Sequence, residues 1–171
     1  MATVATQNAP SLRTQNASSL LSSEMMVRFA LVPLAVAICY CFEWRQLRFL
    51  TSEANLRVDL LAGISLQRLS YDTLAWRGVL YRYENACTFV DVWFGCLPLL
   101  WQWGRGLIKN VLFFSGMALA LFAFNVFRLS VSDVLFAVGL PWDLAHNVIS
   151  GLAYFLVWVW VWRHRADSAA I

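Results

Sequence analysis

The chain has 171 residues, of which 60% are hydrophobic and only 13% are charged. Soluble domains are usually about half apolar and about a quarter charged, so this composition argues for a membrane protein rather than a soluble domain. A net charge of +3, with no basic run among the aromatic residues, argues against a nucleic-acid-binding surface. The length suits one domain with a few membrane spans.

The four cysteines and two histidines predict neither a disulfide framework nor a metal site. Cys39, Cys41 and Cys96 fall within apolar segments. Cys87 and Cys96 would lie about 13 Å apart along one helix, which is too far for a disulfide. The sequence has no C-x-x-C motif that would indicate zinc. We therefore expect no metal and no cofactor.

The N-terminal part of the chain divides into a polar tail and an apolar segment. Residues 1–23 are rich in Ser, Thr, Asn and Gln without apolar periodicity, which predicts a disordered cytoplasmic tail. Residues 25–42 form the first predicted membrane span. Arg28 lies near the start of this span, where its long side chain can reach the lipid headgroups.

A longer polar section follows at residues 43–84. Leucines and an isoleucine recur there at helical spacing among charged residues, which predicts an amphipathic helix lying on the membrane: Leu56, Leu60, Leu61 and Ile64. Residues 73–83 have aromatic and β-branched runs on both sides of Arg77-Gly78, and this pattern predicts a small β-hairpin.

Three further apolar segments predict spans at 88–103, 107–127 and 144–162, each about long enough to cross a hydrocarbon core near 30 Å. The predicted fold is therefore an all-α membrane protein with four transmembrane helices. Its single membrane domain covers 24–165, and a short C-terminal tail covers 166–171.

The positions of basic residues next to the spans predict the orientation. Arg105 and Lys109 flank the tightest turn, and Arg163 and Arg165 follow the last span. Basic residues close to spans favour the cytoplasmic side. We therefore expect a multi-pass protein of the inner or plasma membrane with both termini in the cytoplasm, and an extracytoplasmic section at 43–84.

Three chemically active residues are predicted to meet at the outer face of the membrane. Cys87 begins the second span, Arg128 ends the third, and His146 lies in the first turn of the fourth. A guanidinium and a helix N-terminus favour a thiolate, and a neutral histidine can act as a general base. Arginine can stabilise a thiolate or an oxyanion. This pattern is that of a cysteine nucleophile with its acid/base and its electrostatic stabiliser.

Two polar residues are candidates for supporting these groups. Asn125 precedes Arg128 by three residues and therefore shares its helix face, where it could orient the guanidinium or bond another helix. Asp91 follows Cys87 by four residues and could pair with the arginine or serve as a boundary polar group. Cys87 and Arg128 also have plainer interpretations, since a boundary cysteine is often a small apolar residue and a terminal arginine is often a headgroup anchor. His146 is the better functional candidate, because ionisable residues inside spans are costly.

Short motifs around these residues resemble the exosortase/archaeosortase family of membrane transpeptidases. The sequence Glu84-Asn85-Ala86-Cys87 opens a span, Asn125-Val126-Phe127-Arg128 closes the next, and His146 to Gly151 starts the last. The resemblance covers about residues 72–162. Two features depart from the family pattern: Phe89 stands where many members have Gly, and a single span precedes the core where larger members have more.

The resemblance implies a membrane-embedded cysteine transpeptidase or protease. Such an enzyme cleaves exported proteins at a C-terminal sorting signal made of a short motif, a transmembrane helix and a basic tail, and transfers them to an acceptor. By position, Cys87 resembles the nucleophile, His146 the acid/base and Arg128 the stabiliser. The alternatives are a non-catalytic four-span envelope assembly or partner-binding protein, and a transporter or channel subunit with Arg128 and His146 along its path.

Overall fold

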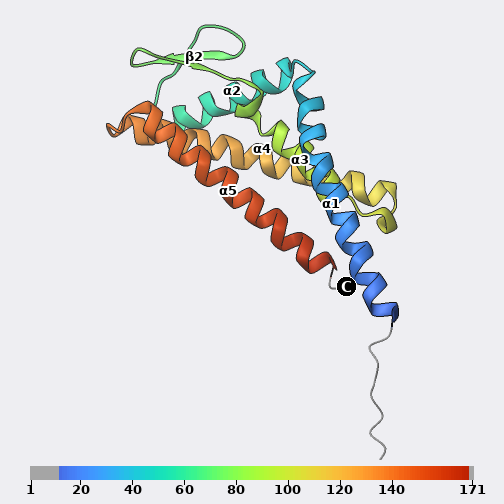
Figure 1. The fold of residues 1–171 in the computed structure, drawn as a ribbon. Helices are drawn as coiled ribbons and strands as arrows, with labels where there is room; N and C mark the ends of the chain where they lie inside the picture. The colour runs from blue at the N-terminus through green and yellow to red at the C-terminus, as the bar shows by residue number, and fades with distance from the viewer. Residues whose placement is uncertain (1–11, 170–171) are drawn as a thin grey trace, which may run out of the picture.

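The computed structural model describes residues 12–169, and side chains over residues 23–164. In this part of the chain five helices, two 3-10 helices and a three-stranded sheet follow one another (Figure 1). In chain order the elements are α1 (Leu12–Tyr40), α2 (Arg45–Leu61), β1 (Gln67–Arg68), β2 (Thr73–Trp76), β3 (Val79–Arg82), η1 (Asn85–Thr88), α3 (Val90–Leu100), η2 (Trp103–Arg105), α4 (Leu107–Ala137) and α5 (Trp142–Ala169).

Three helices of the described chain are long and apolar enough to cross a membrane. They are Ser23–Tyr40 within α1, Leu107–Ala137, which is α4, and Trp142–His164 within α5. These helices agree with the expectation of a helical membrane protein. The start of α1 and the end of α5 lie on the same side of the molecule, away from the sheet (Figure 1).

The segment predicted as the second span is much shorter than expected. Instead of covering 88–103, α3 has 11 residues, about 16 Å at about 1.5 Å per residue, against a hydrocarbon core of about 30 Å. Phe89, which precedes the helix, has a left-handed backbone (φ 58°), and Trp101, which follows it, has an extended backbone (ψ 124°). The chain then turns through η2 before α4 begins.

The guanidinium of Arg28 binds the C-terminal end of α3 instead of reaching for the lipid headgroups. It donates hydrogen bonds to Pro98 O at 3.1 Å and Trp101 O at 2.7 Å, and it pairs with Glu24 at 2.6 Å. The last carbonyls of a helix have no partner within the helix, so a donor from α1 satisfies them. Arg28 thereby fixes α3 against α1.

Other boundaries also differ from those predicted. α4 runs to Ala137, ten residues beyond the predicted end of the third span, because no Gly or Pro lies between residue 127 and Gly139. α1 already begins at Leu12, within the tail predicted as disordered, and residues 1–11 lie outside the described chain. α5 continues to Ala169, so residues 166–169 extend the last helix rather than form a tail.

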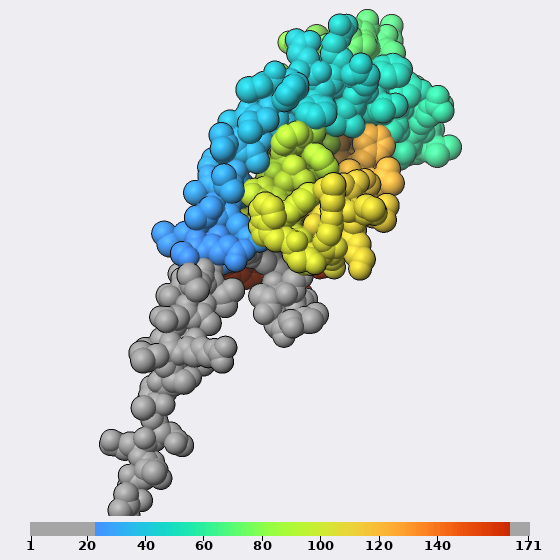
Figure 2. Space-filling view, turned by 90° about the vertical axis from the view of Figure 1, so that its right-hand side faces the viewer, coloured from blue at the N-terminus to red at the C-terminus, as the bar shows by residue number. Residues whose placement is uncertain are grey.

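The polar section folds over one end of the helices, as Figure 2 shows for α2 and the sheet. Strands β2 and β3 form an antiparallel pair in which Thr73 faces Arg82 and Trp76 faces Val79, and β1 adds a third strand. Both residues of the turn, Arg77 and Gly78, have positive φ, as the tightest two-residue hairpins require.

The helix α2 buries a polar face, although the helical spacing of its leucines is the feature that predicted the helix from the sequence. Its fully buried side chains are Thr51, Ser52, Asn55 and Asp59. Leu61 is 89% exposed and Leu60 is 59% exposed. The polar face is buried because Asn55 hydrogen-bonds to α4, as described below. The exposed leucines point away from the protein, as a helix on a membrane surface requires.

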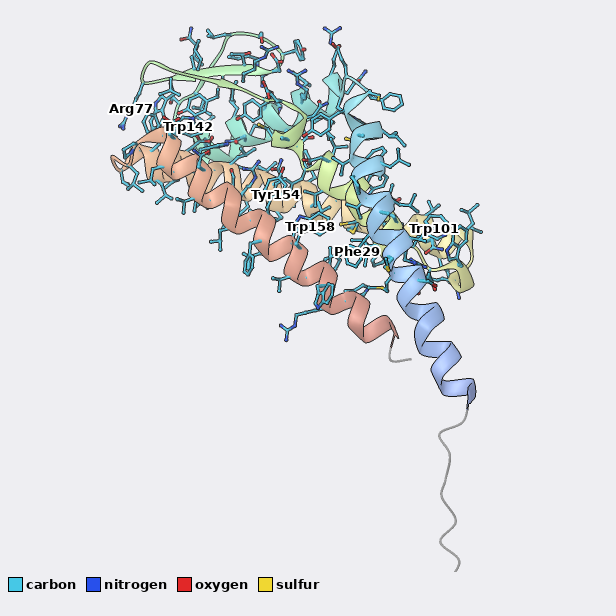
Figure 3. All side chains as sticks on the ribbon, viewed as in Figure 1. Phe29, Arg77, Trp101, Trp142, Tyr154 and Trp158 are labelled. Atoms are coloured by element: carbon cyan, nitrogen blue, oxygen red, sulfur yellow. The ribbon has the colours of Figure 1, made fainter. Side chains whose placement is uncertain are left out.

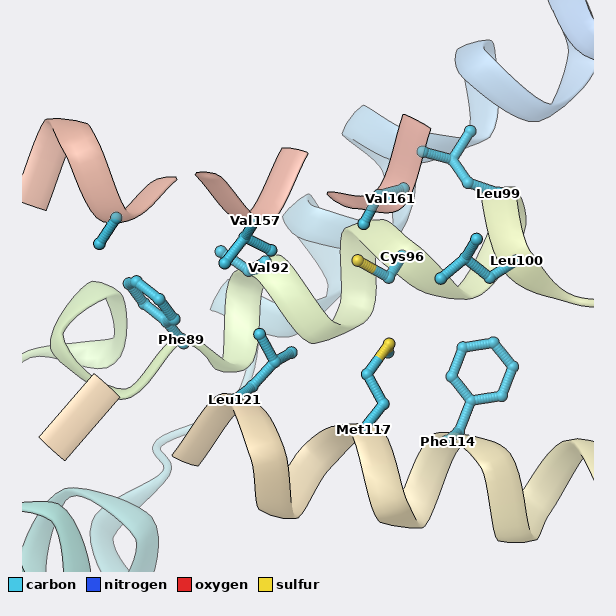
Figure 4. Packing of buried hydrophobic residues seen from close by; sticks show 11 residues of the cluster. Phe89, Val92, Cys96, Leu99, Leu100, Phe114, Met117, Leu121, Val157 and Val161 are labelled. Atoms are coloured by element: carbon cyan, nitrogen blue, oxygen red, sulfur yellow. The ribbon is translucent and has the colours of Figure 1, made fainter. Parts of the chain in front are cut away.

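The main apolar core lies between α3, α4 and α5 (Figure 4). Side chains from the three helices interdigitate there: Phe89, Val92 and Cys96 with Phe114, Met117 and Leu121, and with Val157 and Val161. Gly95 lets α3 approach α5 closely, because a β-carbon there would lie 3.2 Å from the Trp158 ring, a tight contact.

A second core, formed by Leu74, Tyr81, Tyr83 and Leu129, lies beneath the sheet. Figure 3 shows Arg77 and Trp142 at the sheet end of the molecule and Phe29 and Trp101 towards the other. The two cores therefore serve different purposes: one joins the helices, and the other fixes the polar section onto α4 and α5.

Candidate functional site

A cavity of about 250 Å³ lies where the sheet and η1 meet α4 and α5. Both Cys87 and His146 line it, so two of the three predicted catalytic residues share one space. The remaining lining residues come from β3, the segment after it, α4 and the start of α5: Leu80, Tyr81, Arg82, Tyr83, Leu129, Asp133 and Trp142.

Cys87 lies in η1, one turn before α3. Its backbone N–H donates to Glu84 O at 3.0 Å, and its carbonyl accepts a hydrogen bond from Asn125 Nδ2 at 2.7 Å. Burial raises the pKa of the Cys87 thiol, and the nearby charge of Arg128 opposes this rise. The thiol is therefore protonated at rest, and it needs a base before it can act as a nucleophile.

Arg128 is buried in α4, with only 3% of its surface exposed. Its Nε donates to Asn125 Oδ1 at 2.9 Å, and its Nη1 donates to Ser150 Oγ of α5. Its guanidinium carbon lies 4.8 Å from the centre of the Phe89 ring. Because α4 continues to Ala137, Arg128 is an interior helix residue rather than the last residue of a span. Its charge is held by hydrogen bonds and an aromatic face within reach of Cys87.

Asn125 connects the arginine to the cysteine. One amide end binds Cys87 O and the other accepts from Arg128, so a single side chain that is fully buried sets the relative position of η1 and the guanidinium. The i, i+3 spacing of Asn125 and Arg128 in the sequence predicted this shared helix face.

His146 lies one turn into α5 and packs under Trp142. The two ring centres are 5.0 Å apart at an interplanar angle of 30°. The Nδ1 atom is buried and has no hydrogen-bond partner among the described residues. A buried polar atom without a partner costs free energy, so its retention beside a cavity is typical of a functional group.

Asp91 supports the site through a tyrosine rather than through Arg128. Its carboxylate lies 3.3 Å from the Tyr154 hydroxyl and 3.4 Å from the Tyr40 hydroxyl, and it accepts from Val92 N at 2.9 Å. Tyr154 also lies 3.2 Å from Ala86 O. Asp91 thus fixes the backbone next to Cys87 from the α5 side.

Phe89 occupies the position where the resembled family often has Gly. Its backbone is left-handed, with φ 58° and ψ 15°, a conformation that glycine adopts without strain. The ring is 1% exposed and lies 4.8 Å from Tyr154 and 6.2 Å from Phe124, in addition to its contact with Arg128. These contacts offset the strain, about 1–2 kcal/mol for a residue with a β-carbon.

Two further groups were missed by sequence reasoning. Asp133 and Tyr81 both line the cavity, and Asp133 meets Asp59 of α2 at its back. Asp133 lies beyond residue 127, where the third span was predicted to end, but within α4 of the structure. The signal that could have placed it in the helix is the absence of Gly and Pro between residue 127 and Gly139.

The arrangement has the parts for acyl transfer: a thiol and an imidazole with an available nitrogen at one cavity, and a buried arginine outside the cavity lining that acts electrostatically on the thiol. Within residues 23–164, no group of three His, Cys, Asp or Glu side chains could hold a metal ion. In comparisons with protein-family models, curated proteins and solved structures, nothing matches this chain.

Proposed function

We propose that the protein is a membrane cysteine transpeptidase or protease of the exosortase/archaeosortase kind. The observation that carries the proposal is that Cys87 and His146 line one cavity while Arg128, held by Asn125, lies behind the cysteine. These residues come from η1, α4 and α5, so the fold brings together side chains that are far apart in the sequence.

In the proposed reaction His146 takes the proton of the Cys87 thiol, and the sulfur attacks the carbonyl carbon of the scissile peptide bond. The charge of Arg128 stabilises the thiolate and the oxyanion that follows. His146 then gives its proton to the leaving amine, which leaves an acyl group on the sulfur. An acceptor nucleophile attacks this thioester, loses its proton to His146 and frees Cys87.

The proposed substrates are exported proteins with a C-terminal motif, a transmembrane helix and a basic tail. The cavity lies at the sheet end of α4 and α5, and the polar section covers it. In a cell the proposal places this end outside, both termini in the cytoplasm, and α3 with the loop before α4 as the return of the chain through the membrane.

The test is the processing of a tagged substrate in cells. We expect Cys87→Ala and His146→Ala to abolish cleavage while the protein still accumulates in the membrane. Cys41→Ala is the matched control, because Cys41 is exposed at the end of α1 and does not line the cavity. Normal processing by Cys87→Ala would remove the nucleophile and leave the non-catalytic assembly or partner-binding protein as the better description.

A further inference from the structure

Two buried carboxyl groups face each other behind the cavity, one from α2 and one from α4. Asp59 is 0% exposed and Asp133 is 1% exposed. Asn55 Nδ2 donates to Asp133 Oδ2 at 3.0 Å and also to Asp59. The two carboxyl groups share the Asn55 amide as a hydrogen-bond donor, and adjacent buried carboxylates cannot both be ionised.

Neither carboxyl group of this pair has a cationic partner in the described chain. The ion pairs over residues 23–164 involve the acidic residues Glu24, Glu53 and Asp72. Burial raises the pKa of Asp59, as expected of a carboxyl group without a cation. Buried charges are normally paired, and ionisable residues on membrane helices usually face a functional path.

Tyr81 adds an independent observation at the same place. Its side chain is 94% buried, since the residue is 6% exposed, and it lines the cavity together with Asp133. Its hydroxyl has no hydrogen-bond partner in the described structure. The hydroxyl and the two carboxyl groups interact electrostatically. One part of the cavity wall therefore combines a buried carboxyl group that has no cationic partner with a free hydroxyl, next to apolar walls from Leu129 and Trp142.

We propose that Asp133 and Tyr81 bind an ammonium group of the substrate and so position the reacting carbonyl at Cys87. The ammonium supplies the missing cation and favours the ionised form of Asp133 while Asp59 stays protonated. It donates one hydrogen bond to Asp133 and another to the Tyr81 hydroxyl. Arg82 also lines the cavity, but its side chain is exposed and leaves the buried wall without a cation. The inference rests on the proposed function in one respect, namely which molecule carries the ammonium group. That molecule is either the cleaved polypeptide, through a side chain, or an amine acceptor.

The experiment uses the reactivity of Cys87 and therefore needs no turnover. The full chain in detergent micelles, carrying Cys41→Ala, is treated with cationic aminoethyl or neutral methyl methanethiosulfonate, and mass spectrometry follows the modification of Cys87. We expect Asp133→Asn to lower the cationic-to-neutral rate ratio about tenfold, which corresponds to about 1.4 kcal/mol. Tyr81→Phe should lower it less.

Glu84→Gln is the matched control, because Glu84 also acts electrostatically on Cys87 but does not line the cavity. An unchanged ratio in Asp133→Asn, or an equal fall in Glu84→Gln, would overturn the subsite.

A second measurement needs no substitution of Asp133 or Tyr81. Ethylammonium or N-acetyl-lysine methylamide should protect Cys87 from the neutral reagent, whereas tetramethylammonium, which lacks N–H donors, should not. Protection by ethylammonium indicates an amine acceptor, and protection by the lysine derivative indicates a side chain of the cleaved polypeptide. Protection by neither compound would contradict the proposal even if cleavage by Cys87 were established.

Discussion

The reactivity of Cys87 depends on two opposing influences. Burial favours the neutral thiol, and the positive charge of Arg128 favours the thiolate. Burial prevails, so the pKa of the thiol is raised rather than lowered. This differs from the expectation that the helix start and the arginine would hold a thiolate at rest. In the proposed mechanism, Cys87 therefore becomes a nucleophile only when His146 accepts its proton.

The balance at Cys87 predicts a particular pH dependence. Because the pKa of the thiol is raised, its alkylation by iodoacetamide should keep increasing with pH above the range where glutathione is fully ionised. Arg128→Gln removes the charge that favours the thiolate, so it should raise the pKa further and slow alkylation at neutral pH. The measurement is the alkylation rate at Cys87 across pH, located by mass spectrometry.

Arg105→Gln provides the control for this series, because Arg105 lies in η2 and contacts Phe113 instead of the site. Its pH profile should match that of the unchanged chain. A faster alkylation in Arg128→Gln than in Arg105→Gln would show that the arginine shields the sulfur rather than stabilising its anion.

At the scale of the elements, α3 is a short helix whose end is satisfied by other parts of the chain. Arg28 binds its last carbonyls, and Asn110 of α4 exchanges hydrogen bonds with Gln102, donating to its carbonyl at 2.8 Å and accepting from its N–H at 3.3 Å. Irregular backbone at membrane depth is tolerated only where protein groups satisfy it. These two side chains allow the chain to turn before α4.

Replacement of Arg28 tests this role. Arg28→Leu keeps an apolar side chain on α1 but leaves the carbonyls of Pro98 and Trp101 without their donor. We expect the free energy of unfolding in detergent to fall by about 1–3 kcal/mol, the usual cost of an unsatisfied buried group. Arg28→Lys should lose less, since an ammonium still reaches one carbonyl. Equal stability of Arg28→Leu and the unchanged chain would contradict the capping role.

The shared cavity of Cys87 and His146 could be predicted from their places at the starts of two apolar segments, and the Asn125–Arg128 contact from helical spacing. Arg128 itself does not line the cavity, and it lies inside α4 rather than at the predicted end of a span. The proximity of Asp59 and Asp133 could not be predicted, because it depends on a contact between α2 and α4, which are far apart in the sequence. Apolar periodicity in α2 indicated its leucine-bearing face, but it gave no sign that the opposite, polar face is buried against Ser130 and Asp133 of α4.

For the whole molecule, the polar section closes one end of the helices and the two described ends of the chain lie at the other (Figure 1). Arg77 at the tip of the hairpin donates to Ala137 O at 3.0 Å, which joins the sheet to the last residue of α4. Cys87 lies in the segment that links the sheet to α3, so the position of the site follows from that of the polar section.

This arrangement predicts the topology in a cell. If α3 and the loop after it return the chain through the membrane, reporters fused to the N- and C-termini should both be cytoplasmic, and a cysteine replacing Gly78 should react with an impermeant reagent from outside. The matched control is a cysteine replacing Gly104, in the turn before α4, which should react only after the membrane is opened. Termini on opposite sides would mean that α3 does not return the chain, and Cys87 would then lack an extracytoplasmic substrate.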